Sequence, residues 1–159
     1  QGLGQGNGGG PAGWALVSTA LINMMNTAGS GFSILTALTL VSVAFICYSF
    51  VDDTDVVHVG RDVNVTGEEI LVQMQEVVDH WEGGLKATGG ALVPSKSYWY
   101  LVDFIWDGKK WTYLTKEDVP GDISIRTVDG ESCVNLTRYE VHHAEETLGV
   151  HFSMDGNNT

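Results

Sequence analysis

The spacing of apolar and polar positions changes along the chain and predicts a series of mixed elements. Residues 14–26 are apolar apart from a few small polar side chains and follow Pro11, which predicts a buried helix that ends at the next glycines. Residues 41–51 are rich in β-branched and aromatic side chains, which predicts a buried strand. Residues 56–59 are Val-rich and predict the returning strand of a hairpin.

A second helix is predicted to begin after Thr66. Thr66 and Glu69 have the spacing of a capping box, in which each side chain accepts a hydrogen bond from the other residue's main-chain N–H. Apolar side chains then recur at helical spacing and form one face: Ile70, Met74, Val77, Val78 and Trp81. We expect this helix to end at Gly83-Gly84.

The last third of the chain predicts strands and tight turns. Residues 98–104 form one predicted strand, and Asp107-Gly108 between two aromatic runs predicts a hairpin. Asp129-Gly130 predicts a second hairpin, and residues 142–146 a short helical turn. The whole order predicts an α+β fold in which helices pack on one face of an antiparallel sheet.

Charge is distributed unevenly in the 159 residues. The formal net charge is −12, and residues 1–51 contain no Asp, Glu, Lys or Arg. This balance argues against electrostatic binding of nucleic acid by this chain alone. The two cysteines, Cys47 and Cys133, have no paired spacing, and no basic segment precedes an apolar run at the start, so we expect an intracellular protein. The first residue is Gln, which favours an excerpt of a longer protein.

The opening ten residues form a glycine-rich loop. Gly4, Gly6 and Gly9 have the spacing of a dinucleotide-binding fingerprint, but no strand precedes them and no acid follows ~20 residues later. Gln5-Gly6, followed by Pro11 and a helix, resembles the Gln-Gly…Pro loop of reverse transcriptases. The resemblance implies that Gln5, Gly6 and Pro11 support the templating base and the incoming nucleotide.

A pair of carboxylates follows the apolar run in Phe50-Val51-Asp52-Asp53. Adjacent carboxylates at a hairpin tip suit a hard cation such as Mg²⁺, although Asp-Asp is also common in turns that bind nothing. The segment resembles the Tyr-x-Asp-Asp box of reverse transcriptases, with Phe50 in place of the tyrosine. The resemblance implies that Asp52 is the main ligand of Mg²⁺ or Mn²⁺, that Asp53 supports it, and that Phe50 lies beside the nucleotide.

Two later segments extend the resemblance. Gly84-Leu85 followed by Pro94-Ser95-Lys96 is similar to an element that follows the aspartate box in retrotransposon enzymes, and residues 148–150 are similar to the Leu-Gly-Val that ends their palm domain. The resemblance implies that Lys96 lies near the nucleotide phosphates and protonates the leaving pyrophosphate.

These motifs occur in the family's order, so the chain resembles part of the palm of a retrotransposon reverse transcriptase. The resemblance implies template-directed nucleotidyl transfer by a two-metal mechanism, with primer-template and dNTP as partners of the full-length parent. It also implies a ferredoxin-like core that is incomplete at the N-terminus, and an isolated chain that is inactive. The expected parts are a loop and helix at 1–31, the aspartate hairpin at 41–59, a helix, lysine loop and strand at 66–104, and hairpins at 105–159.

Other interpretations remain open. An inactive retroelement-derived domain would keep the same motifs without activity. Residues 32–51 are about long enough to span a bilayer, but five Ser and Thr residues dilute the run, and we expect no membrane contact. His142-His143 with Glu145-Glu146 lacks a second ligand pair at zinc spacing.

Overall fold

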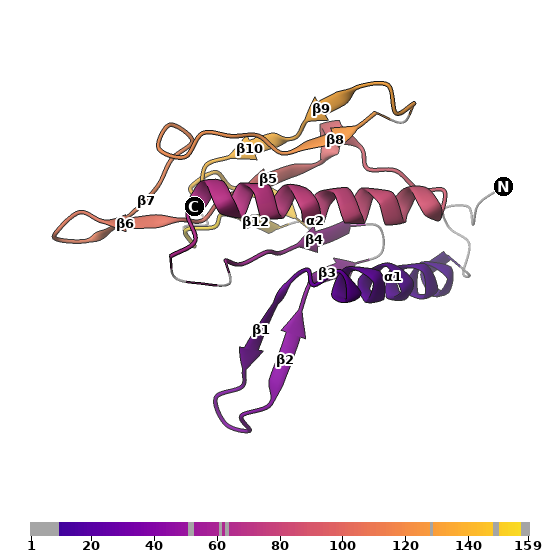
Figure 1. Ribbon diagram of the computed structural model, residues 1–159, viewed down its shortest axis with the longest axis horizontal. Helices are drawn as coiled ribbons and strands as arrows, with labels where there is room; N and C mark the ends of the chain where they lie inside the picture. Colours follow the sequence, from indigo (N-terminus) through magenta and orange to yellow (C-terminus); the bar gives the residue numbers. More distant parts are fainter. Residues whose placement is uncertain are drawn as a thin grey trace. The chain divides into compact units, whose positions relative to one another are not determined.

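The computed structural model describes residues 10–50, 53–60, 62, 64–127, 129–147 and 150–156 of the chain (Figure 1). The described part contains two α-helices, one short 3₁₀ helix and twelve short strands, which confirms an α+β composition. The residues divide into two compact units. Unit 1 comprises Gln1–Val65 and Gln73–Ala91, and unit 2 comprises Thr66–Val72 and Leu92–Thr159.

Helix α1, Gly10–Thr27, opens the described part of unit 1 and confirms the first predicted helix. Pro11 occupies its first turn, where the missing N–H costs nothing because no helical partner exists for it. Leu21 and Met25 are the buried apolar side chains, four positions apart on one face. Most other side chains of α1 are exposed or half-buried, so the expectation of a mostly buried helix was wrong.

The apolar run after α1 forms two hairpins, and the single buried strand predicted at 41–51 was wrong. Strand β1, Phe32–Leu35, pairs antiparallel with β2, Ser42–Phe45, and Figure 1 shows this hairpin extending away from α1. The chain changes partner at Ile46, which is buried, and continues as β3, Cys47–Phe50, antiparallel to β4, Asp53–Val56. An unbroken apolar run carries no periodicity that marks such a break.

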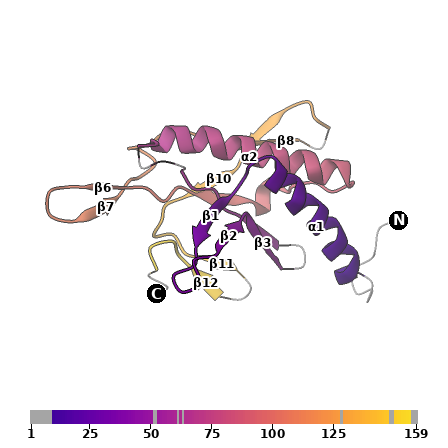
Figure 2. The same cartoon turned by 60° about the horizontal axis from the view of Figure 1, so that its bottom comes forward.

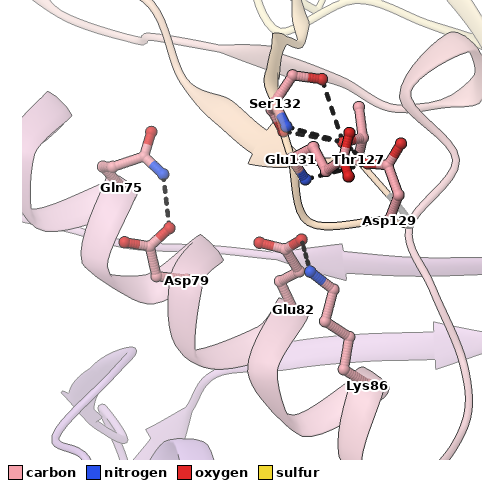
Figure 3. A network of polar contacts seen from close by, with 8 residues as sticks. All are labelled: Gln75, Asp79, Glu82, Lys86, Thr127, Asp129, Glu131 and Ser132. Atoms are coloured by element: carbon pink, nitrogen blue, oxygen red, sulfur yellow. Dashed lines mark hydrogen bonds and ion pairs between the residues drawn. The ribbon is translucent and has the colours of Figure 1, made fainter.

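Helix α2, Gly67–Ala87, begins as predicted. The main-chain N–H of Thr66 donates to Glu69 Oε2 at 3.0 Å, and that of Glu69 donates to Thr66 Oγ1 at 3.3 Å, so the capping box is confirmed. Along the helix, Gln75 Nε2 donates to Asp79, and Lys86 pairs with the buried Glu82 at 2.9 Å (Figure 3).

The predicted end of α2 at Gly83-Gly84 was wrong, because the helix continues through both glycines. A Cβ on Gly84 would come within 2.7 Å of Leu21 and Met24 side-chain atoms, so the missing side chain permits close packing inside unit 1. The helix ends instead at Ala87, and Gly89 caps it with a φ of 83°, a conformation that is favourable for glycine. There the N–H of Gly90 donates to Leu85 O and that of Gly89 donates to Lys86 O, the pattern of a Schellman cap.

Unit 2 consists mainly of short paired strands that follow the 3₁₀ helix η1, Pro94–Lys96. The turns at Asp107-Gly108 and Asp129-Gly130 each connect an antiparallel pair, so both predicted hairpins are confirmed. The helical turn predicted at 142–146 was wrong, because Glu145 to Thr147 pair with the last strand (Figure 2). The pairs are β5 (Tyr98–Tyr100) parallel to β10 (Thr137–Tyr139), and antiparallel β6 (Phe104–Trp106) with β7 (Trp111–Tyr113), β8 (Ser124–Arg126) with β9 (Cys133–Asn135), and β11 (Glu145–Thr147) with β12 (Val150–Phe152).

The described strands therefore form six two-stranded ladders, five antiparallel and one parallel. They do not form the one continuous antiparallel sheet that the sequence pattern predicts, because local turn signals specify hairpins and leave pairing between hairpins open. No helix in the described part of the chain is long and apolar enough to cross a membrane. Residues 32–50 in particular belong to the two hairpins of unit 1 rather than to a helix.

The buried core of unit 2 is built mainly from strand and loop residues, together with Leu71 of α2. Ile123 and Ile125 are almost fully buried on alternate positions. Arg138 is also buried; its guanidinium donates to Val119 O at 2.6 Å and lies 4.9 Å from the centroid of the Trp99 ring. Burial lowers the pKa of Arg138, while Glu140 and Asp122 partly compensate by their charge.

Candidate functional site

The predicted aspartate hairpin is present as the β3–β4 ladder in unit 1. Phe50 pairs with Asp53 and Ser49 pairs with Thr54, so the strands approach one another directly on either side of residues 51 and 52. Asp53 begins β4 and is exposed. Val51 and Asp52 lie outside the described residues, as does the side chain of Phe50. The hairpin expected around the aspartates is thus confirmed, while the relative placement of the two carboxylates stays a prediction.

Polar side chains connect this hairpin to α1. The indole Nε1–H of Trp14 donates to Ser49 Oγ at 3.2 Å. Ser49 Oγ in turn lies 3.2 Å from the main-chain oxygen of Asp53 and 3.0 Å from Thr54 Oγ1. The Ser49 hydroxyl on β3 therefore contacts Asp53, which is a predicted metal ligand, the next residue Thr54, and the Trp14 side chain on α1. Nothing in the sequence pattern singles out Ser49.

A third acid, Asp55, lies farther along β4 opposite Tyr48 and is half-buried. Among the described residues no group of three or more His, Cys, Asp or Glu is arranged to hold a metal ion.

The other predicted site residues fall in three places. Pro11 is the second residue of α1 and is exposed, whereas Gln5 and Gly6 lie outside the described residues. Lys96 ends η1 in unit 2, and its side chain is exposed. The roles that the resemblance implies for Gln5, Pro11 and Asp52 stay predictions.

A pocket of about 180 Å³ in unit 1 was not anticipated from the sequence. His58 Nε2 lies 2.8 Å from Gln73 Oε1 and donates to it, because an amide oxygen only accepts. The Nδ1 atom of His58 is buried and has no hydrogen-bond partner in the structure. Glu76 and His80, four positions apart on α2, give a helical spacing that could have indicated a shared surface. The lining residues are Ala28, Gly29, Ser30, His58, Gln73, Glu76, Val77 and His80.

The β6–β7 hairpin of unit 2 carries an exposed aromatic face. Phe104 is opposite Tyr113 and Trp106 is opposite Trp111, so their alternate positions place all four rings on one side of the ladder. Adjacent rings meet edge to face at centroid distances of 5.5 to 6.0 Å. Phe104, Trp111 and Tyr113 line an open apolar pocket of about 320 Å³. The sequence pattern predicted the hairpin but not the exposed aromatic face that its residues form.

The turn of the same hairpin is held by one carboxylate and carries two lysines. Asp107 Oδ1 accepts the main-chain N–H groups of Lys109 and Lys110, each at 2.8 Å. These bonds lower the pKa of Asp107, with that from Lys110 contributing most. The segment 104–113 holds one acid and two lysines, so this part of an acidic chain has a small positive balance.

Comparisons with family models, with curated proteins and with solved structures find no match for this chain. The assignment of a function must therefore come from the motifs and from the local geometry of each unit.

Proposed function

We propose that this chain is part of the palm of a retrotransposon-type reverse transcriptase, and that the β3–β4 hairpin carries its metal-binding aspartates. The single observation that supports the proposal most is the register of that hairpin. The Phe50–Asp53 pair puts Asp53 at the end of the ladder, next to the connection, which is the position that the resemblance implies for it. The complete palm, with its ferredoxin-like core, would need strands beyond those described.

The donor set is suited to Mg²⁺ or Mn²⁺. Asp53 is exposed beside the connection and Asp52 precedes it, so both offer carboxylate oxygens to a hard cation that keeps several water ligands. The two carboxylates would hold the metal pair, which would supply activation of the primer 3′-hydroxyl and stabilisation of the leaving pyrophosphate. Asp52 would be the main ligand and Asp53 the supporting one.

The remaining residues have positioning and proton-transfer roles in this proposal. Gln5, Gly6 and Pro11 would support the templating base and the nucleotide, and Phe50 would lie against the nucleotide. Lys96, which is exposed at the end of η1, is free to approach phosphates and would protonate the pyrophosphate. The exposed aromatic face of β6–β7 and Lys109-Lys110 offer stacking surfaces and positive charge of the kind that nucleic acid contacts.

Primer extension tests the proposal. In the longer polymerase polypeptide that the proposal requires, Asp52→Asn should lower the rate of nucleotide addition on an RNA template at least about a hundredfold, because several kcal/mol of metal-dependent stabilisation is lost. Asp62→Asn is the matched control, since Asp62 is exposed and, within the described part of the chain, its carboxylate accepts hydrogen bonds from Asn64, two positions further along. It should leave the rate unchanged.

The 159-residue chain alone should add no nucleotide, because no acid precedes Asp52 to hold the other side of the metal pair. Full activity of the Asp52→Asn polypeptide would refute the proposal. A longer polypeptide that is folded but inert before any substitution would instead favour the retroelement-derived domain without activity.

A further inference from the structure

Ser49 is the point at which three parts of unit 1 meet through hydrogen bonds. Its hydroxyl lies within 3.2 Å of Trp14 Nε1 on α1, and the two residues are 35 positions apart. It also lies 3.2 Å from the Asp53 main-chain oxygen and 3.0 Å from Thr54 Oγ1, both on β4.

The donors and acceptors around Ser49 can all be satisfied at once. The indole N–H only donates, so Ser49 Oγ accepts from Trp14. The Asp53 carbonyl only accepts, so the Ser49 hydroxyl proton is directed to it. Thr54 Oγ1 then donates to the second lone pair of Ser49. Each bond has a different role, and removal of the Ser49 oxygen breaks all three.

The contact matters because a two-stranded ladder is only marginally stable in water. β3 and β4 form such a ladder, and their last pair before the aspartate connection is Phe50 with Asp53. A bond to the Asp53 carbonyl restrains the main chain that carries the Asp53 carboxylate. The bond from Trp14 extends that restraint to α1, the helix that directly follows the glycine-rich loop in sequence.

We propose that Ser49 is a positioning residue that, through Trp14, fixes the metal-binding end of the β3–β4 hairpin against α1. This role rests on the proposed function. It makes the affinity for a divalent cation depend on a serine and an indole that do not themselves touch the cation. An ordinary cross-strand Ser–Thr pair would give no such dependence on Trp14, because that pair lies wholly within the ladder.

The first measurement observes the hydrogen bond between Ser49 and Trp14 without reference to activity. In ¹⁵N-labelled chain, the indole signal lost in Trp14→Phe identifies Trp14 among the five tryptophans. Ser49→Ala should shift that signal upfield and raise its exchange with water about tenfold, whereas Ser49→Thr, which keeps a hydroxyl, should leave both unchanged. Ser42→Ala, at an exposed serine on β2, is the matched control and should have no effect.

The second measurement uses Mn²⁺ alone as the probe. Mn²⁺ should broaden the amide signals of Asp53 and Thr54 in the unsubstituted chain. Ser49→Ala should weaken the apparent Mn²⁺ affinity three- to tenfold, and Trp14→Phe should weaken it by a similar factor. The Mn²⁺ affinity of the double variant should be no lower than that of either single variant, because both substitutions break the same chain of hydrogen bonds.

The outcomes separate the two proposals. An indole signal that Ser49→Ala does not change overturns the connection from Ser49 to Trp14 and leaves the proposed function standing. Mn²⁺ affinity that is unchanged in Ser49→Ala, or additive losses in the double variant, overturns the positioning role. A hairpin that Mn²⁺ does not broaden in the unsubstituted chain overturns the proposed metal site, and the positioning role with it, even where the indole still responds to Ser49.

Discussion

Gly31 and Gly89 share the same φ of 83° but have different surroundings. A Cβ on Gly31 would collide with the main-chain oxygen of Phe45 and come within 2.9 Å of Ile46 Cα, whereas a Cβ on Gly89 would meet nothing within 4 Å. Main chain cannot move aside as the end of a side chain can. Gly31 therefore permits the close approach that lets β2 turn into β3.

We expect Gly31→Ala to lower the free energy of unfolding by at least about 3 kcal/mol, since the left-handed conformation alone costs about 1–2 kcal/mol and the collision adds to it. Gly89→Ala should lower it only by that conformational cost. Urea unfolding followed by far-UV circular dichroism measures both. Equal losses in the two variants would show that the main chain near Ile46 relaxes freely.

Individual site residues were predictable only where a motif marks them. The sequence placed Asp53 beside a hairpin connection, and the ladder register confirms that position. It gave no indication of Ser49, because the partner that distinguishes this serine is 35 positions away. His58 and Gln73 meet across 15 positions for the same reason. Such contacts depend on how elements pack, which periodicity does not encode.

Elements were predicted well where their ends have a chemical signature. The capping box fixed the start of α2, and Asp-Gly turns fixed two hairpins. The end of α2 was missed because Gly83 and Gly84 are tolerated inside a helix whose Trp81 and Leu85 are buried. Burial of two large apolar side chains, at about 1.5–3 kcal/mol each, offsets a glycine cost of about 1 kcal/mol per residue.

The β1–β2 hairpin is an element with an unusual surface. Leu38 is 97% exposed and Leu40 is 68% exposed at its tip, and no charged residue occurs in the hairpin. Bonds among Thr36, Thr39 and Val41 organise the tip without burying either leucine. Exposed apolar hairpins without charge favour association between copies, because nothing on their surface opposes it.

Leu38→Ser with Leu40→Ser should therefore raise the concentration at which the chain begins to associate, with little change in the free energy of unfolding. Light scattering across a concentration series measures the first quantity, and urea unfolding the second. Leu21→Ser is the contrasting variant, since Leu21 is 3% exposed and its substitution should unfold unit 1. An association threshold that is unchanged when both tip leucines are replaced would contradict the expectation.

The whole molecule combines strong acidity with carboxylates that are individually stabilised in turns. Asp107, Asp118 and Asp129 of unit 2 are exposed, and hydrogen bonds lower the pKa of each. The leading donors are the Lys110 main chain for Asp107, the Thr115 main chain for Asp118 and the Thr127 hydroxyl for Asp129. Figure 3 shows the last of these turns, where Thr127 also bonds to Ser132.

These turns could be predicted from the sequence because each bond joins residues two or three positions apart. The parallel pairing of β5 with β10 was not, since 39 positions separate Tyr98 from its partner Thr137. The same limit applies to the fold as a whole. Turn chemistry specifies hairpins one at a time, and the arrangement of ladders follows from packing that emerges only after they form.

The pH dependence of stability follows from the direction of these pKa shifts. Because hydrogen bonds lower the folded-state pKa of Asp118 below the unfolded value of 3.8, the unfolded chain takes up a proton first as the pH falls. The contribution of Asp118 to stability is therefore fully present well above pH 3.8 and is lost as the pH falls through the lowered pKa of the folded state. From neutral pH down to the isoelectric point near 4.5, the net charge of −12 diminishes and its self-repulsion fades, which opposes any loss in that range.

We expect stability to hold from neutral pH to about the isoelectric point and to decline below pH 3.8. Asp118→Asn should be less stable than the unsubstituted chain at pH 6, and the difference should shrink as the pH falls further below 3.8, because the carboxylate it lacks is then protonated in both states. Glu117→Gln removes a neighbouring exposed carboxylate and is the control for the loss of one negative charge. Thermal unfolding from pH 2 to 7 supplies the measurement. A difference for Asp118→Asn that grows on acidification would reverse the sign of the linkage and show that the Thr115 bonds stabilise the protonated form.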